Sequence, residues 1–189
     1  MPESIRCFIA VDLTNNIKNH IQELQNNIKP LDCDINWVDH KITHWTLKFL
    51  GVTVWEKTPE IIAKLNQCAC MIKPFTIETG QLGAFPDIGH PQILWVELQS
   101  PDEGFHTITK NIETGLSDLG YKKESRAFQA HVTIGRVKSR KNYSSLKIHL
   151  ENYKISTLKQ RVDKIMLYKS TLSPQGPIYN PLQEIFLNP

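Results

Sequence analysis

The sequence contains one four-residue pattern twice, as His44-Trp45-Thr46-Leu47 and as His131-Val132-Thr133-Ile134. Each tetrad reads His-x-Thr-x with apolar residues at both x positions, and each lies in a segment rich in strand-forming residues. Residues i and i+2 of a strand point to the same face. Each tetrad therefore predicts a strand that presents an imidazole and a hydroxyl on one face and two apolar side chains on the other.

The repetition exceeds what composition predicts. The chain has 7 histidines, 13 threonines and 40% apolar residues among 189 residues. At these frequencies chance predicts roughly 0.08 tetrads of this kind, and two are present. The copies lie in the first and second halves of the chain. If the two strands face a common cleft, they supply two imidazoles and two hydroxyls around one small anionic group.

Two histidines and two threonines around one cleft are suited to acid–base chemistry on a phosphate. Free imidazole titrates near pH 6.5, so one histidine can take a proton from a nucleophile while the other gives one to a leaving oxygen. The hydroxyls of Thr46 and Thr133 would donate to the non-bridging oxygens, where charge accumulates in the transition state. Cyclic phosphodiesters fit because the strained ring leaves only water activation and leaving-group protonation to supply. We therefore assign His44 and His131 as candidate catalytic residues.

The scheme needs no metal and no cofactor. A metal site built on the two histidines is disfavoured because threonine is a poor ligand and no carboxylate keeps their spacing. The cysteines have no zinc-site spacing, and we expect free buried thiols, which suit a reducing cytosol. They are Cys7, Cys33, Cys68 and Cys70.

Two cations near the motifs are weaker candidates for phosphate binding. The planar fork of Arg136 could clamp a phosphate, but strict alternation puts it on the face opposite His131. A bulge at Gly135 would turn it back. Lys48 shares the face of His44 by the same alternation. For each cation a solvated surface charge is equally consistent with the sequence.

Aromatic residues and the remaining histidines are less informative. Phe8 and Trp37 could stack on a nucleobase, although core packing is the better interpretation of both. Five histidines lack the motif and are assigned no role: His20, His40, His90, His106 and His149.

Composition is that of a soluble globular protein. The charged fraction is 22% and the formal net charge is +3, which is compatible with a short polyanionic ligand but does not demand one. The N-terminal residues lack the apolar stretch of a signal peptide, and no apolar run approaches membrane-spanning length. We expect a cytoplasmic protein, without membrane contact, that acts as a monomer.

The periodicity of apolar residues, together with capping and turn residues, predicts four helices and eight strands. The first helix has Thr14 as its N-cap and ends at Pro30, and the second has Thr58 as its N-cap. The third carries an apolar stripe from 105 to 119 and is stopped by Gly120. The fourth spans 143–150. The strands are expected at 5–11, 36–38, 44–50 with a stop at Gly51, 75–78, 93–98, 130–137, 162–168 and 178–187, with a loop at 83–91 and a turn at 173–177.

This order mixes hairpins with helices and predicts an α+β fold with largely antiparallel sheets. Both His-x-Thr strands come just before a helix. We therefore expect one domain, residues 1–189, made of two similar lobes with flanking helices around a central cleft.

Longer stretches around the motifs resemble a known family, the RNA 2′,3′-cyclic phosphodiesterases, also called 2′-5′ RNA ligases, of the two-histidine phosphoesterase superfamily. The similarity includes Thr43-His44-Trp45-Thr46-Leu47-Lys48-Phe49-Leu50-Gly51 and Phe128-Gln129-Ala130-His131-Val132-Thr133-Ile134-Gly135-Arg136. It extends to 6–12, 83–86, 93–96, 167–172 and 176–179, in the family's order. One departure is Ala130, where a proline often precedes the second histidine.

The resemblance implies hydrolysis of a terminal RNA 2′,3′-cyclic phosphate to a 2′-phosphate, without metal or nucleotide cofactor. It implies that His44 protonates the departing 3′ oxygen, that His131 activates the attacking water and that Arg136 contacts the phosphate. RNA ends or small cyclic nucleotides would be the partners. Reverse operation would join RNA halves through a 2′-5′ bond. Two alternatives stay open: a phosphodiesterase of 2′-5′ oligoadenylate or small cyclic nucleotides, and a non-catalytic module that binds RNA ends.

Overall fold

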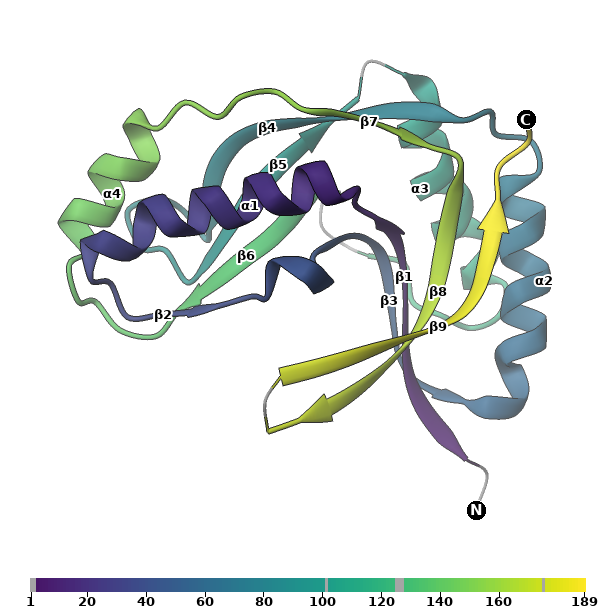
Figure 1. The fold of residues 1–189 in the computed structure, drawn as a ribbon. Helices are drawn as coiled ribbons and strands as arrows, with labels where there is room; N and C mark the ends of the chain where they lie inside the picture. The colour runs from purple at the N-terminus through teal and green to yellow at the C-terminus, as the bar shows by residue number, and fades with distance from the viewer. Residues whose placement is uncertain (1–2, 101, 125–127, 175) are drawn as a thin grey trace.

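The computed structural model describes residues 3–100, 102–124, 128–174 and 176–189, which form two antiparallel sheets and four α-helices (Figure 1). The first sheet has the order β3 (His44–Val54), β1 (Ser4–Asp12), β8 (Lys164–Ser173) and β9 (Gly176–Phe186). The second has the order β2 (Ile35–Trp37), β6 (His131–Val137), β5 (Ile93–Gln99), β4 (Phe75–Phe85) and β7 (Lys159–Val162). Each sheet thus receives one motif strand.

Helices α2 (Thr58–Ala69) and α3 (Glu103–Ser117) cover one face of the first sheet, where they contact β9 and β3. Trp45 shows how tightly this layer packs, because its ring is fully buried and stacks on Phe105 of α3 with centroids 4.7 Å apart. The apolar positions of the first motif therefore anchor β3 in the core, as the alternation predicts.

Helices α1 (Asn15–Ile28) and α4 (Tyr143–Asn152) pack on the second sheet (Figure 1). The predicted apolar stripe of α1 is buried at Ile17, Ile21, Leu24 and Ile28, and Thr14 is its N-cap. Although α1 follows β1 of the first sheet, its Gln25 reaches β6 of the second. The chain therefore crosses between the sheets early.

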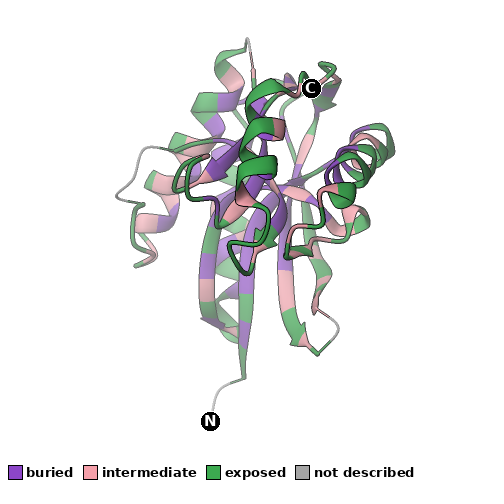
Figure 2. Cartoon of the chain, turned by 90° about the vertical axis from the view of Figure 1, so that its left-hand side faces the viewer, coloured by how far each residue is buried: buried purple, intermediate pink, exposed green. Residues whose placement is uncertain are grey.

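Buried residues concentrate in the strands and the inward faces of the helices (Figure 2). One large cluster joins both sheets and all four helices. A second, small cluster of Phe8, Ala10, Met166 and Tyr168 lies apart from it, with Tyr179 packed against it. Because residues of a strand alternate, this small cluster occupies the face of the first sheet that α2 and α3 leave uncovered.

Two predicted strand ends are wrong for the same reason. Gly51, with φ of 69°, does not stop the motif strand, which continues to Val54. It forms an irregularity in which Leu50 is skipped between the pairs Phe8–Phe49 and Cys7–Gly51. Residues 83–85 of the predicted loop belong to β4, where they pair with β5. In both places cross-strand pairing overrides the local preference of glycine.

Two smaller expectations also differ from the structure. The predicted strand 162–168 is two strands, since β7 pairs with β4 in the second sheet whereas β8 pairs with β1 in the first. Thr58 is the first residue of α2 and Lys57 is the N-cap. The predicted turn at 173–177 joins β8 to β9, and its Gln175 lies outside the described residues.

Candidate active site

His44 and Thr46 lie on the face of the first sheet that the helices leave uncovered. His44 pairs with Asp12 and Thr46 with Ala10 across β3 and β1, and directly opposed residues share a face. We call the side of each sheet that carries its histidine the motif face. On the first sheet the small cluster around Phe8 lies on the motif face.

Two aromatic rings and one hydrogen bond fix the imidazole of His44. The ring of Phe8 lies 4.8 Å from it between centroids, and Tyr179 meets it edge-on at 5.1 Å. Its Nδ1 donates to the carbonyl oxygen of Ile42 at 3.0 Å. This bond selects the tautomer that leaves Nε2 able to accept or release a proton.

The second motif repeats this arrangement on the second sheet. His131 Nδ1 donates to the carbonyl oxygen of Gln129 at 2.7 Å, again two residues upstream. Phe85 contacts the imidazole edge-on with centroids 5.0 Å apart, and Trp95 lies at 6.3 Å. Thr133 pairs with Trp95, so the threonine and the histidine share the motif face. Each histidine is thus backed by two aromatic side chains and oriented by its own backbone.

A bulge in β6 places Arg136 on the motif face. Thr133 pairs with Trp95 and Gly135 with Leu94, so Ile134 is skipped. Arg136 then pairs with Ile93, which lies on the same side of β5 as Trp95. The bulge that the sequence analysis considered at Gly135 is present at Ile134, one residue earlier. It moves Arg136 from the face opposite His131, where strict alternation would put it, to the same face.

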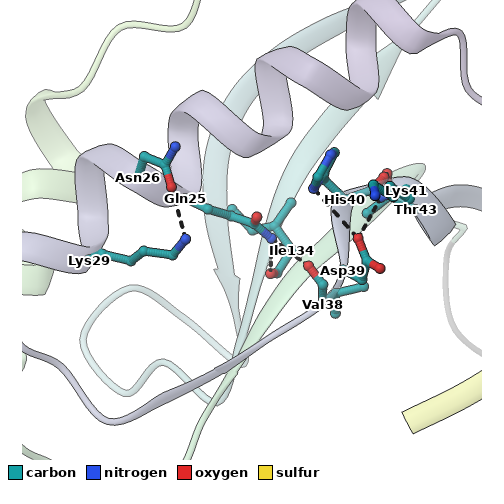
Figure 3. Close-up of polar contacts among 9 residues, drawn as sticks. All are labelled: Gln25, Asn26, Lys29, Val38, Asp39, His40, Lys41, Thr43 and Ile134. Atoms are coloured by element: carbon teal, nitrogen blue, oxygen red, sulfur yellow. Dashed lines mark hydrogen bonds and ion pairs between the residues drawn. The ribbon is translucent and has the colours of Figure 1, made fainter. Parts of the chain in front are cut away.

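Gln25 of α1 supports this bulge, and sequence reasoning missed it. Its buried amide Nε2 donates to the carbonyl oxygens of Val38 at 2.7 Å and of Ile134 at 3.0 Å (Figure 3). The backbone N–H of Val38 also donates to the Ile134 oxygen. The only signal in the sequence is a polar residue beside the apolar stripe of α1.

Lys48 is not on the motif face, contrary to expectation. Ala10 pairs with Thr46 and Ile9 with Lys48, so Leu47 is skipped and Lys48 turns into the core. There its Nζ donates to Glu113 Oε1 at 2.7 Å and to the carbonyl oxygen of Lys122 at 2.8 Å. A lysine held in this way is a structural ion pair.

The predictions for the two aromatic residues and for the cysteines are only partly confirmed. Phe8 is buried, as the core interpretation has it, and its neighbour is His44. Trp37 is half-buried against the large cluster. All four cysteines are free, but only Cys7 and Cys68 are buried, while Cys70 is exposed where α2 ends.

The two motif strands come together although they belong to different sheets. β3 contacts β6 directly, and Trp45 of the first motif lies 6.2 Å from the ring of Phe128, three residues before His131. Tyr179, which touches His44, also feels the positive charge of Arg136, which opposes the rise that burial causes in the tyrosine pKa. The charge of the second motif's arginine therefore acts on an aromatic side chain that contacts the first motif's histidine.

A pocket of about 190 Å³ opens beside His44. Its walls come from the first sheet, α1 and the turn before β3, and they include Asp12, Lys18, Lys41, Tyr168 and Tyr179. His131, Thr133 and Arg136 are not among the described residues that line it. The pocket thus adjoins the first motif on the side of the first sheet.

Burial lowers the pKa of both histidines from the usual value of about 6.5. For His44 the charge of Lys18 adds to the lowering, while the hydrogen bond to Ile42 and the charge of Asp12 oppose it. For His131 the hydrogen bond to Gln129 opposes the effect of burial on the pKa. In both histidines burial therefore favours the neutral imidazole, whose Nε2 can accept a proton.

A model of the 2′-5′ RNA ligase superfamily matches residues 14–173 of the chain. The chain belongs to this superfamily. Within it, the RNA 2′,3′-cyclic phosphodiesterase of Methanocaldococcus jannaschii is 36% identical over 181 residues, covering 95% of this chain and 99% of the relative. The enzyme of the same name from Aquifex aeolicus is 32% identical and covers 97% of both chains. The resemblance read from the motifs is confirmed.

Solved structures of similar fold support the architecture. The protein TT0787 of Thermus thermophilus has a TM-score of 0.80 at 24% identity and covers 97% of this chain and 98% of its own. LigT of E. coli complexed with 3′-AMP has a TM-score of 0.79 at 20% identity and covers 99% and 100%. The predicted α+β fold with two antiparallel sheets is confirmed. Among the described residues, no helix combines the length and apolarity needed to span a membrane.

Proposed function

We propose that this protein hydrolyses the 2′,3′-cyclic phosphate at the end of an RNA strand to a 2′-phosphate. The observation that carries the proposal is the repeated geometry: two histidines with the same Nδ1 hydrogen bond and the same threonine neighbour, on two strands that contact each other. Relatives in the family that cover nearly the whole chain bear the name RNA 2′,3′-cyclic phosphodiesterase, which supports this substrate class.

In the proposed reaction His131 Nε2 takes a proton from water, whose oxygen attacks phosphorus. The bond from phosphorus to the 3′ oxygen breaks, and His44, which enters this step protonated on both ring nitrogens, gives its Nε2 proton to that oxygen. Afterwards His131 releases the proton that it took from water, and His44 regains one from solvent. The phosphate remains on the 2′ oxygen. The division of roles between the two histidines follows the family resemblance.

Thr46, Thr133 and Arg136 supply the electrostatic part of the mechanism. As the water attacks, negative charge grows on the two non-bridging oxygens. One hydroxyl from each motif would donate to them, and the guanidinium of Arg136 would neutralise the charge through paired N–H groups. With the 5′-hydroxyl of a second RNA end as nucleophile in place of water, the same groups would break the same bond to the 3′ oxygen and join the two ends through a 2′-5′ phosphodiester.

One assay separates this proposal from its alternatives. The protein is incubated in excess chelator with 2′,3′-cyclic AMP, with an oligonucleotide ending in a 2′,3′-cyclic phosphate and with 2′-5′-linked oligoadenylate. Conversion of the cyclic ends to 2′-phosphates supports the proposal. Cleavage of the oligoadenylate alone would instead establish a different phosphodiesterase, and tight binding of RNA ends without turnover would establish a binding module.

A further inference from the structure

The pocket beside His44 carries two ammonium groups that the proposed mechanism does not use. Lys18 comes from the first turn of α1 and Lys41 from the short turn before β3, so two elements that contact each other bring two positive charges to one cavity. Both lysines line the same pocket as His44, and the positive charge of Lys18 lowers the pKa of that imidazole.

The net charge available to a ligand in this pocket is positive. Among the described residues that line it, Asp12 is the single carboxylate, and it already accepts a 2.6 Å hydrogen bond from the hydroxyl of Tyr168. Neither Lys18 nor Lys41 forms an ion pair with a carboxylate of the described residues. The lysines that do so are Lys48, Lys64, Lys141, Lys147, Lys159, Lys164 and Lys169. The cavity therefore favours an anion.

The direction of the reaction indicates which anion this is. Water attacks phosphorus from the side opposite the departing 3′ oxygen, so the histidine that protonates that oxygen stands on the ribose side. With His44 in this role, the pocket next to His44 also lies on the ribose side. The RNA chain leaves the terminal ribose through its 5′ oxygen, and the next group along it is a phosphodiester.

We infer that Lys18 and Lys41 bind the phosphodiester on the 5′ side of the terminal nucleoside, and that the enzyme thereby prefers RNA ends over free cyclic mononucleotides. This inference rests on the proposed function. Two ammonium groups on flexible stems suit a phosphodiester because they act as point charges without fixing one orientation of the strand. The tyrosines of the pocket supply apolar walls for the sugar.

The test compares three substrates that differ stepwise. They are 2′,3′-cyclic AMP, the same nucleotide carrying a 5′-phosphate, and an adenosine dinucleotide ending in a 2′,3′-cyclic phosphate. The variant is Lys18→Gln/Lys41→Gln, and the control is Lys29→Gln/Lys73→Gln, which removes the same charge from exposed positions outside the pocket. Circular dichroism checks that both fold.

For the wild type and the control we expect KM to fall roughly 10- to 100-fold when the 5′-phosphate or the second nucleotide is added. The pocket variant should lose this gain and retain its KM for 2′,3′-cyclic AMP within about twofold. Added salt should also lower kcat/KM for the dinucleotide less steeply in the pocket variant than in the wild type, because fewer charges attract the substrate.

Equal losses on all three substrates would overturn the inference, because the lysines would then serve the reacting phosphate. An unchanged preference in the variant would overturn it as well. If no cyclic substrate is turned over, the proposed function fails, and calorimetry still decides the inference. Adenosine 2′-phosphate with and without a 5′-phosphate should then bind the wild type with different affinity and the variant with equal affinity.

Discussion

Leu47 and Ile134 occupy the same position in strands of different sheets: each is the fourth residue of its motif, and each is skipped in the pairing with the neighbouring strand. Up to the threonine, alternation holds in both motifs. Beyond it the parity reverses, so the residue four after the histidine turns into the core and the residue five after it turns to the motif face. This relationship buries Lys48 and brings out Arg136.

Arg136→Ala should raise KM for a cyclic-phosphate substrate roughly 10-fold or more, because the variant has no charge-assisted hydrogen bond to offer the phosphate. Arg136→Lys should recover only part of the affinity, since an ammonium cannot replace two parallel N–H donors. Steady-state kinetics measure both. Arg140→Ala, an exposed position after β6, is the control. Unchanged KM in Arg136→Ala would remove this residue from the site.

His44→Ala and His131→Ala should each lower kcat by roughly 10²- to 10⁴-fold, because each removes one of two proton transfers. Both side chains are half-buried on the motif faces rather than in the large cluster, so the variants should stay folded by circular dichroism. His90→Ala, at a largely exposed imidazole, should keep wild-type activity. Substantial activity in either motif variant would refute the two-histidine mechanism.

Gln25→Leu should lower the free energy of unfolding by about 1 kcal/mol, because the partly buried carbonyl of Val38 loses its side-chain donor. It should also raise KM in the same direction as Arg136→Ala, since the bulge at Ile134 loses one of its supports. Denaturant titration and kinetics measure the two effects. Asn26→Ala, at the exposed neighbouring position, should change stability by less than about 0.5 kcal/mol. Wild-type KM in Gln25→Leu would show that the bulge holds without this amide.

The pH dependence of kcat/KM should be bell-shaped, with both limbs below about pH 6.5. Burial lowers the pKa of both histidines, so the base is lost as pH falls through one lowered pKa and the acid is lost as pH rises through the other. Asp12→Asn should move the limb that belongs to His44 to lower pH, because the aspartate charge raises that pKa. A flat profile from pH 5 to 9 would argue against paired proton transfer.

Local sequence patterns, which involve only residues close together in the chain, are enough to predict much of the fold and the site. The two tetrads, the shared face of each histidine and its threonine, and the buried stripe of α1 all follow from periods of two or 3.6 residues. The order of helices and strands was also predictable, except that one expected strand is two. The motifs were specific enough to indicate the family.

Features that depend on which strand pairs with which could be seen only in the folded molecule. A bulge is a mismatch between two strands, so no count along one strand could show that Lys48 turns inward or that Arg136 turns out. The chain changes sheet between β7 and β8 because β7 pairs with β4 of the second sheet and β8 with β1 of the first. The pocket that unites Lys18, Lys41 and Tyr179 likewise exists only once α1, β3 and β9 have packed, because its residues lie too far apart in the chain for any local pattern to connect them.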